Sequence, residues 1–403
     1  MQNASPDENA LLPAHPPVSA APVVQWLLAE GRRSADIRAL IAELARRMNG
    51  IGVPVARLNV SIPTLHPLVY AHTYRWTRGM DQAEQTPREH TIRDSPDYQV
   101  SPLKPVYEEN RIIRRRLDVP SPILDFPILE EFRAKGFTDY LALPAQGRVG
   151  HRMAVTWATD RPGGFDEDDI ARLGGILPVL SLVLEIHSQE TITRTLLDTY
   201  IGRHSGTRVL DGSIRRGSGE TIHAALWLCD LRGSTEMAEH LPRDVMLGSL
   251  NAFFEAVVGR VHNHGGEVLK FMGDGLLAIF RPDLVGEGLC VCRAVDAADE
   301  AFSAIDTLNA ARLAVGEPAL RFGLGLHLGD VVYGNIGAPD RLDFTVIGSA
   351  VNLVSRLESL TKTVDRPILM SSEFAKLCPR PTQSLGFHTL RGVAEPHEVF
   401  ALS

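Results

Sequence analysis

The spacing of apolar and polar residues in the first half of the chain predicts two strand pairs between two helices. Apolar residues recur at intervals of three and four over residues 37–48, which indicates a helix capped by Ser34. An acidic start after the turn at 161–164 favours a longer helix that runs through Ile186. Between the strand pairs, residues 77–127 are polar, rich in proline and only weakly periodic. The predicted strands cover residues 55–62, 68–76, 138–143 and 151–157.

The segments that border this half have patterns of their own. Residues 1–22 contain five prolines and no long apolar run, which predicts a disordered tail. From 191 to 201 a short helix is expected, because apolar residues repeat at every fourth position and form a seam that can pair two chains. That seam consists of Ile192, Leu196 and Tyr200. Residues 202–219 are rich in glycine and predict a linker.

The second half opens with an apolar strand that ends in an acid. Asp230 closes this strand, and a small, hydroxyl-bearing turn precedes the next helix. The carboxylate of Asp230 can hold a hard cation. Backbone N–H groups at a helix start can receive phosphate oxygens, and here they belong to Gly233, Ser234 and Thr235. Alternatively, Asp230 only caps the helix that follows.

A second acid lies between two short apolar strands that follow a helix over residues 242–262. The turn Gly273-Asp274-Gly275 exposes its carboxylate, although a bare hairpin turn also explains Asp-Gly. Lys270 stands in an otherwise apolar strand beside it. Two adjacent carboxylates repel each other unless cations lie between them, and paired Mg²⁺ ions serve phosphoryl transfer. The pair therefore indicates a nucleoside triphosphate as the ligand.

A third segment combines a strand that ends near Ile347 with a helix that begins at Gly348-Ser349. Asn352 and Arg356, four residues apart, share one face of this helix. They can form an ordinary solvated pair. Over a phosphate, the Asn can orient a sugar and the Arg can neutralise developing charge.

Composition and charge exclude several classes of protein. The 403 residues include 41 basic and 49 acidic side chains, a net charge of −8, and their number suggests two or three domains. A chain of this charge is not built to coat nucleic acid or an anionic membrane. The longest apolar run, residues 173–186, is shorter than the ~20 residues that a membrane span needs. The four cysteines are too few and too irregularly spaced for a disulfide framework or a zinc cluster, and a reducing cytoplasm is the expected location. The basic run at 111–116 could bind an anion, but a solvated helix face or loop is favoured.

Residues 224–403 resemble the catalytic domain of class III nucleotidyl cyclases, the adenylate and guanylate cyclases. Four motifs carry the resemblance: the strand end at Asp230, the run Lys270-Phe-Met-Gly-Asp274-Gly, the run Thr345-Val-Ile-Gly-Ser-Ala-Val-Asn352-Leu-Val-Ser-Arg356, and the closing Leu390-Arg-Gly-Val. The resemblance implies an α+β fold, with a palm-type, ferredoxin-like sheet covered by helices. It also implies two Mg²⁺ or Mn²⁺ ions in each site.

Each motif receives a role by this resemblance. The metal ligands would be Asp230, Asp274 and the carbonyl oxygen of Leu231. Lys270 and Thr345 would recognise the purine.

The remaining roles concern the ribose, the phosphates and the partner subunit. Asn352 would position the ribose, Arg356 would stabilise the transition state and Arg391 would contact phosphate. In this family the metal acids come from one subunit and the other groups from its partner, so a homodimer is implied.

The two residues that would recognise the purine, Lys270 and Thr345, form what we call the purine pair. They favour ATP as the substrate and therefore an adenylate cyclase, which makes cyclic AMP and pyrophosphate. Lys270 can donate to adenine N1, and Thr345 can accept from the exocyclic amine. Guanine presents an N1–H donor to the Lys270 ammonium instead. A guanylate cyclase and an inactive nucleotide-binding regulator remain alternatives. A diguanylate cyclase lacks support, because its Gly-Gly-acid-Glu-Phe turn is absent.

The order of elements in the first half resembles a GAF-type sensor domain of the α/β class, which implies an unidentified signal. The predicted division is a tail at 1–22, a GAF-like domain at 23–188, a helical linker at 189–222 and a cyclase catalytic domain at 223–403.

Overall fold

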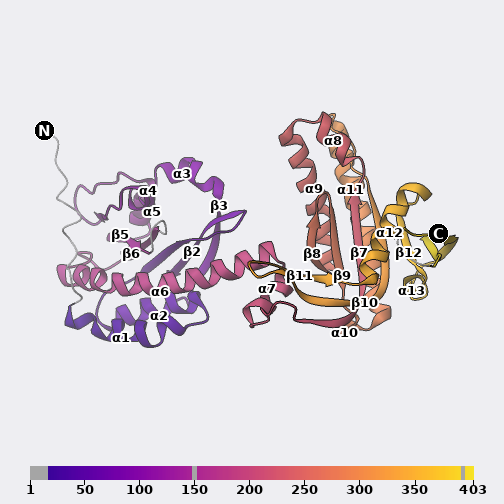
Figure 1. The fold of residues 1–403 in the computed structure, drawn as a ribbon. Helices are drawn as coiled ribbons and strands as arrows, with labels where there is room; N and C mark the ends of the chain where they lie inside the picture. Colours follow the sequence, from indigo (N-terminus) through magenta and orange to yellow (C-terminus); the bar gives the residue numbers. More distant parts are fainter. Residues whose placement is uncertain (1–16, 148–151, 392–394) are drawn as a thin grey trace. The chain divides into compact units, whose positions relative to one another are not determined.

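The computed structural model describes residues 17–147, 152–391 and 395–403, and the chain forms two compact units, Met1–Leu196 and Leu197–Ser403. The first unit contains, in chain order, η2 (Val18–Ala20), α1 (Ala21–Ala29), η3 (Gly31–Arg33), α2 (Ile37–Gly50), β1 (Arg57–Pro63), β2 (Val69–Thr77), β3 (Glu84–Glu89), η4 (His90–Asp94), α3 (Pro96–Gln99), α4 (Leu103–Glu109), β4 (Ile113–Arg116), α5 (Pro127–Ala134), β5 (Asp139–Gln146), β6 (Arg152–Thr159) and most of α6 (Glu167–Tyr200) (Figure 1).

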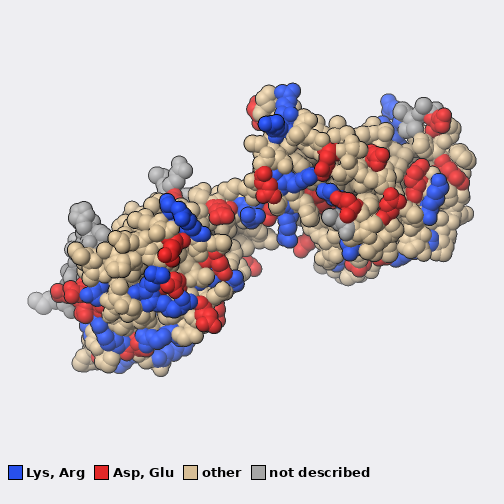
Figure 2. Space-filling model, turned by 90° about the horizontal axis from the view of Figure 1, so that it is seen from below, with Lys and Arg blue, Asp and Glu red and all other residues tan. Residues whose placement is uncertain are grey.

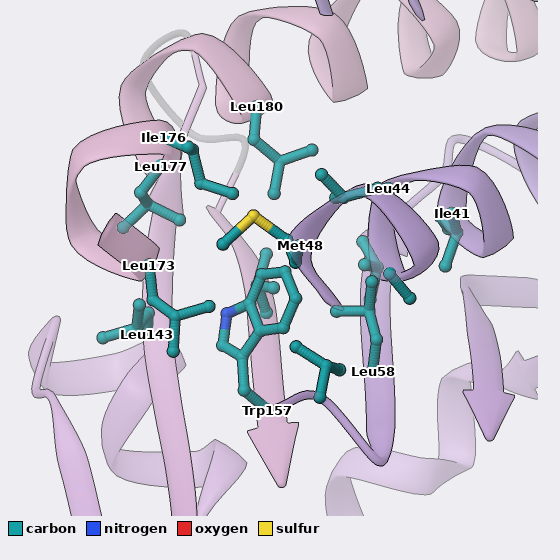
Figure 3. Packing of buried hydrophobic residues seen from close by; sticks show 14 of the residues in the cluster. Ile41, Leu44, Met48, Leu58, Leu143, Trp157, Leu173, Ile176, Leu177 and Leu180 are labelled. Atoms are coloured by element: carbon teal, nitrogen blue, oxygen red, sulfur yellow. The ribbon is translucent and has the colours of Figure 1, made fainter. Parts of the chain in front are cut away.

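The first unit is built on an antiparallel sheet with the strand order β3-β2-β1-β6-β5-β4. Helices α1, α2 and α6 cover one face, where Trp157 of β6 is fully buried among Met48 of α2 and Leu173 of α6 (Figure 3). Ala154 and Ala158 of the same strand face the opposite side, in a second apolar cluster with residues of α4 and α5. Because side chains alternate along β6, this one strand contributes to both cores.

The predicted helices and strands of this unit form, with differences at their ends. α2 begins one residue after Asp36, whose carboxylate accepts the Arg38 N–H at 2.9 Å. The prediction that Ser34 caps this helix is wrong, because the Ser34 hydroxyl donates to the Asp36 carbonyl instead. Residues 18–22 are also not a disordered tail: they form η2 and the start of α1, with Ala20 buried in the core. Residues 1–16 of that predicted tail lie outside the described residues.

The polar middle region contains more structure than its pattern predicts. It holds β3, η4, α3, α4 and β4. The favoured interpretation of the basic run at 111–116, a solvated helix face or loop, is wrong because strand β4 occupies 113–116. Arg115 is 6% exposed and pairs with Asp125 at 2.6 Å. Arg115 of β4 therefore serves the fold through an ion pair with the loop that follows the strand.

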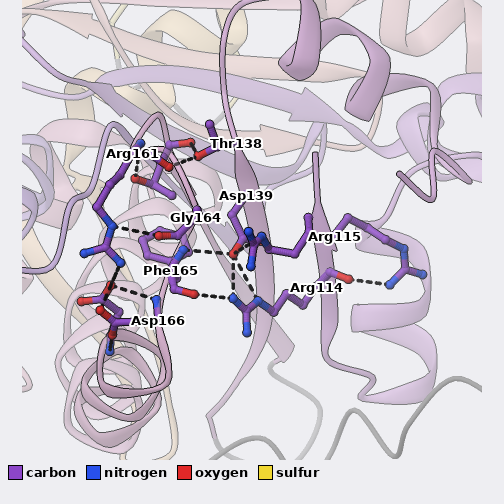
Figure 4. A network of polar contacts seen from close by, with 12 residues as sticks. Arg114, Arg115, Thr138, Asp139, Arg161, Gly164, Phe165 and Asp166 are labelled. Carbon is purple, nitrogen blue, oxygen red and sulfur yellow. Dashed lines mark hydrogen bonds and ion pairs between the residues drawn. The ribbon is translucent and has the colours of Figure 1, made fainter. Parts of the chain in front are cut away.

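A buried carboxylate joins β4 and β5 to the turn before α6 (Figure 4). Asp139 is fully buried and accepts from Arg114 at 2.8 Å and from the Phe165 N–H at 3.1 Å. Burial raises the pKa of Asp139, and the Arg114 guanidinium opposes that rise. The turn requires Gly164, since its φ is +69° and a Cβ would lie 2.7 Å from an Asp139 oxygen. This network fixes where α6 begins.

Helix α6 is one continuous helix of 34 residues, so the separate short helix predicted at 191–201 is its last part. Within the predicted seam, Ile192 is buried while Tyr200 is 78% exposed. Among the described residues, α6 is the one helix whose length and composition would allow it to cross a bilayer, and 61% of its most apolar stretch is buried within the protein.

The second unit begins at Leu197, near the end of α6. It contains α7 (Arg203–Leu210), β7 (Gly219–Leu231), α8 (Ser234–His240), α9 (Arg243–Asn263), β8 (Glu267–Met272), β9 (Gly275–Phe280), α10 (Pro282–Val285), α11 (Glu287–Ala314), β10 (Phe322–Ala338), β11 (Arg341–Ile347), α12 (Ser349–Val364), β12 (Ile368–Ser371), α13 (Ser372–Ala375), β13 (Thr382–His388) and β14 (His397–Leu402). The glycine-rich segment predicted as a linker thus contains a helix, α7, which packs with Val209 against the sheet.

An eight-stranded sheet organises this unit, with the order β13-β14-β12-β10-β7-β9-β8 and β11 paired to β10. Helices α9 and α11 contribute to the core on one face, and α12 packs on the other. β7 lies near the centre, where Trp227 and Leu226 point into opposite cores and are both fully buried. This two-sided burial explains the continuous apolar run before Asp230.

Basic and acidic side chains are interspersed over the face drawn in Figure 2. On that face, the described residues show no continuous basic surface of the kind that nucleic acid requires.

We predict that His327 makes the second unit sensitive to acid. His327 of β10 is 6% exposed and lies 2.8 Å from the Ser371 hydroxyl, and burial lowers its pKa from 6.5 to about 4. As the pH falls, His327 is therefore protonated in the unfolded chain before it is protonated in the folded protein. The stability that neutral His327 contributes is lost as the pH falls from about 6.5 to about 4.

In chemical denaturation, the stability advantage of the wild type over His327→Gln should shrink by about 3 kcal/mol between pH 7 and pH 4, at 1.36 kcal/mol per pH unit between the two pKa values. An advantage that stays constant over this range would show that His327 does not cause the sensitivity.

Candidate active site

Two carboxylates meet where β7 ends and β9 begins. Asp230 is the penultimate residue of β7, and Asp274 lies in the turn between β8 and β9. In the ladder Asp230 lies opposite Gly275, and the Leu231 N–H donates to the Asp274 carbonyl at 3.3 Å. Gly275 cannot be replaced without disturbance, because a Cβ there would lie 2.4 Å from the Cys229 carbonyl oxygen. The backbone thus brings both predicted acids together.

The surroundings of Asp230 shift the pKa of its carboxyl group. Partial burial is the largest influence and raises the pKa of Asp230. The Asp274 carboxylate raises it further, whereas Lys362 opposes both effects through a hydrogen bond to the Asp230 carboxylate. Like charges held this close favour a cation between them.

The donor chemistry at this strand end fits a hard divalent cation. Asp230 and Asp274 offer carboxylate oxygens, and the adjacent Leu231 offers a carbonyl oxygen, which are ligands that suit Mg²⁺ and Mn²⁺. Throughout the described part of the chain, no group of three or more His, Cys, Asp and Glu side chains could hold a metal ion. The pair would therefore need further oxygen ligands, which the backbone, water or a triphosphate can supply.

Three charged residues beside the acids were missed by sequence reasoning. Lys362 of α12 has its Nζ 3.2 Å from Oδ2 of Asp230. Glu358, one turn earlier in α12, is 4% exposed and lies 3.6 Å from the Arg232 guanidinium. Glu358 and Lys362 are four residues apart, and this spacing on the helix was the one signal in the sequence.

Lys270 and Thr345 come from two strands that contact each other, β8 and β11. Lys270 is half-buried and follows a bulge in the pairing of β8 with β9, between Val268 and Lys270. Thr345 is 4% exposed, and its hydroxyl has no hydrogen-bond partner within the described residues. A buried hydroxyl of this kind calls for a partner, which a ligand can provide.

Asn352 and Arg356 lie on the outward side of α12. Asn352 is exposed and Arg356 is half-buried, while Val354 and Leu357 are buried against the sheet. Helix rise places Asn352 about 15 Å along the axis from Lys362, and Arg356 about 9 Å from it. Within the described residues, no hydrogen bond or ion pair joins Asn352 or Arg356 to the acids of the same chain.

The predicted phosphate contacts lie in two places. Gly233 takes a left-handed conformation and is the N-cap residue of α8, so Asp230 does not cap this helix. Ser234 and Thr235 are the first two residues of α8. Arg391 is exposed, and the described contacts do not connect it with the acids. Residues 392–394, which include the end of the closing motif, lie outside the described residues.

Comparisons with known proteins identify the second unit. The family described as adenylate and guanylate cyclase catalytic domain matches residues 220–391. An uncharacterized protein of Mycobacterium tuberculosis is 38% identical over 205 residues, which are 49% of this chain and 35% of that protein. An uncharacterized protein of Mycobacterium bovis is 38% identical over 202 residues, 48% of this chain and 36% of its own length. The chain thus spans about a third of the curated relatives it matches.

Among solved structures, a bacterial light-regulated adenylyl cyclase is 25% identical with a TM-score of 0.48, over 57% of this chain and 64% of that one. The adenylyl cyclase CyaB from P. aeruginosa is 26% identical with a TM-score of 0.43, over 46% and 96%. The guanylyl cyclase Cya2 is 29% identical with a TM-score of 0.41, over 46% and 93%. From the family match, residues 220–391 form an adenylate and guanylate cyclase catalytic domain of class III.

Proposed function

We propose that this protein is an adenylate cyclase that converts ATP into 3′,5′-cyclic AMP and pyrophosphate with two Mg²⁺ or Mn²⁺ ions. The observation that carries the substrate choice is the purine pair on β8 and β11, in which the Thr345 hydroxyl is buried and without a partner among the described residues. The cyclase domain supplies the reaction class.

The chemistry of this pair favours adenine over guanine. The Lys270 ammonium donates to adenine N1, and the Thr345 hydroxyl accepts from the exocyclic amine. With guanine, the N1–H would face the ammonium and both donors would lose a partner. Such a mismatch at a buried position costs about 1–3 kcal/mol, enough for a clear preference.

The acids and the phosphate contacts have separate tasks. Asp230, Asp274 and the carbonyl of Leu231 would hold the divalent ions, which activate the ribose 3′-hydroxyl and neutralise charge on the triphosphate. The N–H groups of residues 233–235 and the guanidinium of Arg391 would bind phosphate oxygens and so orient the α-phosphorus for in-line attack.

Two copies of the chain would build each site. Asn352 and Arg356 lie about 15 Å and 9 Å along α12 from Lys362, the residue that contacts Asp230, and their side chains are at least partly accessible to another molecule. Arg356 would stabilise the charge that develops on the phosphates, and Asn352 would hold the ribose. A symmetric homodimer would then contain two equivalent sites.

The first unit would act as a GAF-like sensor for a signal that remains to be identified. Its support is the element order, in which two strand pairs enclose an irregular middle and helices cover the sheet. Helix α6 continues without a break into the second unit and offers a covalent route for regulation. The four cysteines are free thiols, which agrees with the reducing cytoplasm that we propose as the location.

The first test concerns the purine. The purified wild type, given equal ATP and GTP with Mn²⁺, should form mainly cyclic AMP. The double variant Lys270→Glu, Thr345→Cys inverts the donors offered to the base, so its ratio of kcat/KM for ATP over GTP should fall at least about tenfold. An unchanged ratio would show that these residues do not read the base.

The second test concerns the shared site. Asp230→Ala and Arg356→Ala proteins should each be inactive alone, because each homodimer lacks an essential group in both sites. A mixture should recover up to about a quarter of the wild-type activity, since half of the dimers would be mixed and each would hold one intact site.

Exchange of subunits is verified by pull-down with two different tags. If exchange occurs and the mixture stays inactive, each chain must build its site alone.

A further inference from the structure

Lys362 places its positive charge beside Asp230, where the proposed divalent ion would bind. The Nζ of Lys362 lies 3.2 Å from Oδ2 of Asp230, and the Asp230 side chain is 26% exposed. The two residues are 132 positions apart in the sequence, so their contact depends on how α12 packs against the end of β7. Lys362 has no place in the roles assigned above.

The helix turn that carries Lys362 is firmly anchored. Glu358 is buried and pairs with Arg232, which also donates to the Thr361 hydroxyl. The Arg232 guanidinium lies against Gly323 of β10, which pairs with Asp230 in the sheet, and any Cβ at residue 323 would overlap the guanidinium. The backbone of Lys362 is therefore held beside Asp230.

The Lys362 side chain is free to leave. It is 53% exposed, so it can turn away from Asp230 into water without giving up a buried environment. A fixed backbone and an ammonium group that can rotate into water are what a displaceable ion-pair partner of Asp230 requires.

The charges around the acids explain why such a partner matters. Asp230, Asp274 and Glu358 bring three carboxylates together, and Lys362 and Arg232 supply two positive charges. Without Lys362, one guanidinium would face three carboxylates. With a divalent ion on Asp230, the Lys362 ammonium would be repelled at short range.

We propose that Lys362 is a displaceable counter-ion of the metal site, which holds Asp230 while no divalent ion is bound and leaves it when an ion binds. It thereby sets the metal concentration at which the site fills. This inference rests on the proposed two-metal site and adds a residue that competes with the metal.

Mn²⁺ binding to the full-length protein without nucleotide tests the competition, measured at one pH near 7.5 by titration calorimetry or by the electron paramagnetic resonance signal of free Mn²⁺. Lys362→Met removes the competing charge, so the Kd for Mn²⁺ should fall roughly threefold to tenfold. Lys362→Arg keeps the charge and should stay within about twofold of the wild type.

Two variants serve as controls. Lys376→Met removes the same charge from an exposed position after α13 and should leave the Kd unchanged. Asp230→Asn should abolish or greatly weaken binding, which ties the measured ion to this site. Thermal unfolding gives a second readout: without metal, Lys362→Met should unfold at a lower temperature than the wild type, and Mn²⁺ should raise that temperature by a larger step.

The outcomes separate the inference from the function on which it rests. If the wild type binds Mn²⁺ through Asp230 and Lys362→Met binds it equally or more weakly, the counter-ion role is wrong while the metal site stands. If the wild type binds no Mn²⁺, the metal site and the counter-ion role both fail.

Discussion

The second unit depends on one backbone pairing, in which Asp230 of β7 lies opposite Gly275 of β9. The pairing brings Asp274 beside Asp230, and it is possible because residue 275 has no side chain to meet the Cys229 carbonyl. A shift by one residue would turn Asp230 to the other face of the sheet and separate the acids. Pairing of β7 with β9 on one side and with β10 on the other holds this register.

Helix α12 carries candidate site residues in both of its halves. Its last turns hold Lys362 and Glu358 beside the acids of their own chain, and its earlier turns present Asn352 about 15 Å and Arg356 about 9 Å along the axis from Lys362. One helix thus links two sites of a proposed dimer. A change in how the two copies meet would move Asn352 and Arg356 relative to the partner's acids, while the contacts with Lys362 would be retained.

Much of this site could be predicted from the sequence because its key residues follow local signals. Asp230 ends an apolar strand, and Asp274 lies between two glycines in a turn, so periodicity and turn chemistry indicated where both acids lie, while the family resemblance suggested their roles. Lys362 and Arg232 could not be found in this way, because their partners lie more than a hundred residues away in the sequence. Such contacts arise only when α12 packs on the sheet.

The same limit explains the errors in the first unit. The arginines of β4 were interpreted as solvated because their pattern shows charge alone, whereas Asp125 and Asp139 neutralise them in the fold. Ser34 and Asp36 are both good capping residues, and the choice depended on a hydrogen bond between them. Helix α7 was not predicted, because its segment is rich in glycine and the helix is stabilised by packing on the sheet, which the local sequence pattern does not show.

Turnover of the Asp274→Asn protein tests the central claim most directly, namely that two adjacent carboxylates at this strand end carry the catalysis. The amide keeps the shape of the side chain and loses the charge that a divalent ion needs, so cyclic AMP formation at saturating Mn²⁺ should fall at least about a hundredfold. Asp306→Asn removes the same charge from an exposed position of α11 and should keep wild-type activity. An Asp274→Asn protein that is folded and retains more than about a tenth of the wild-type rate would contradict the account.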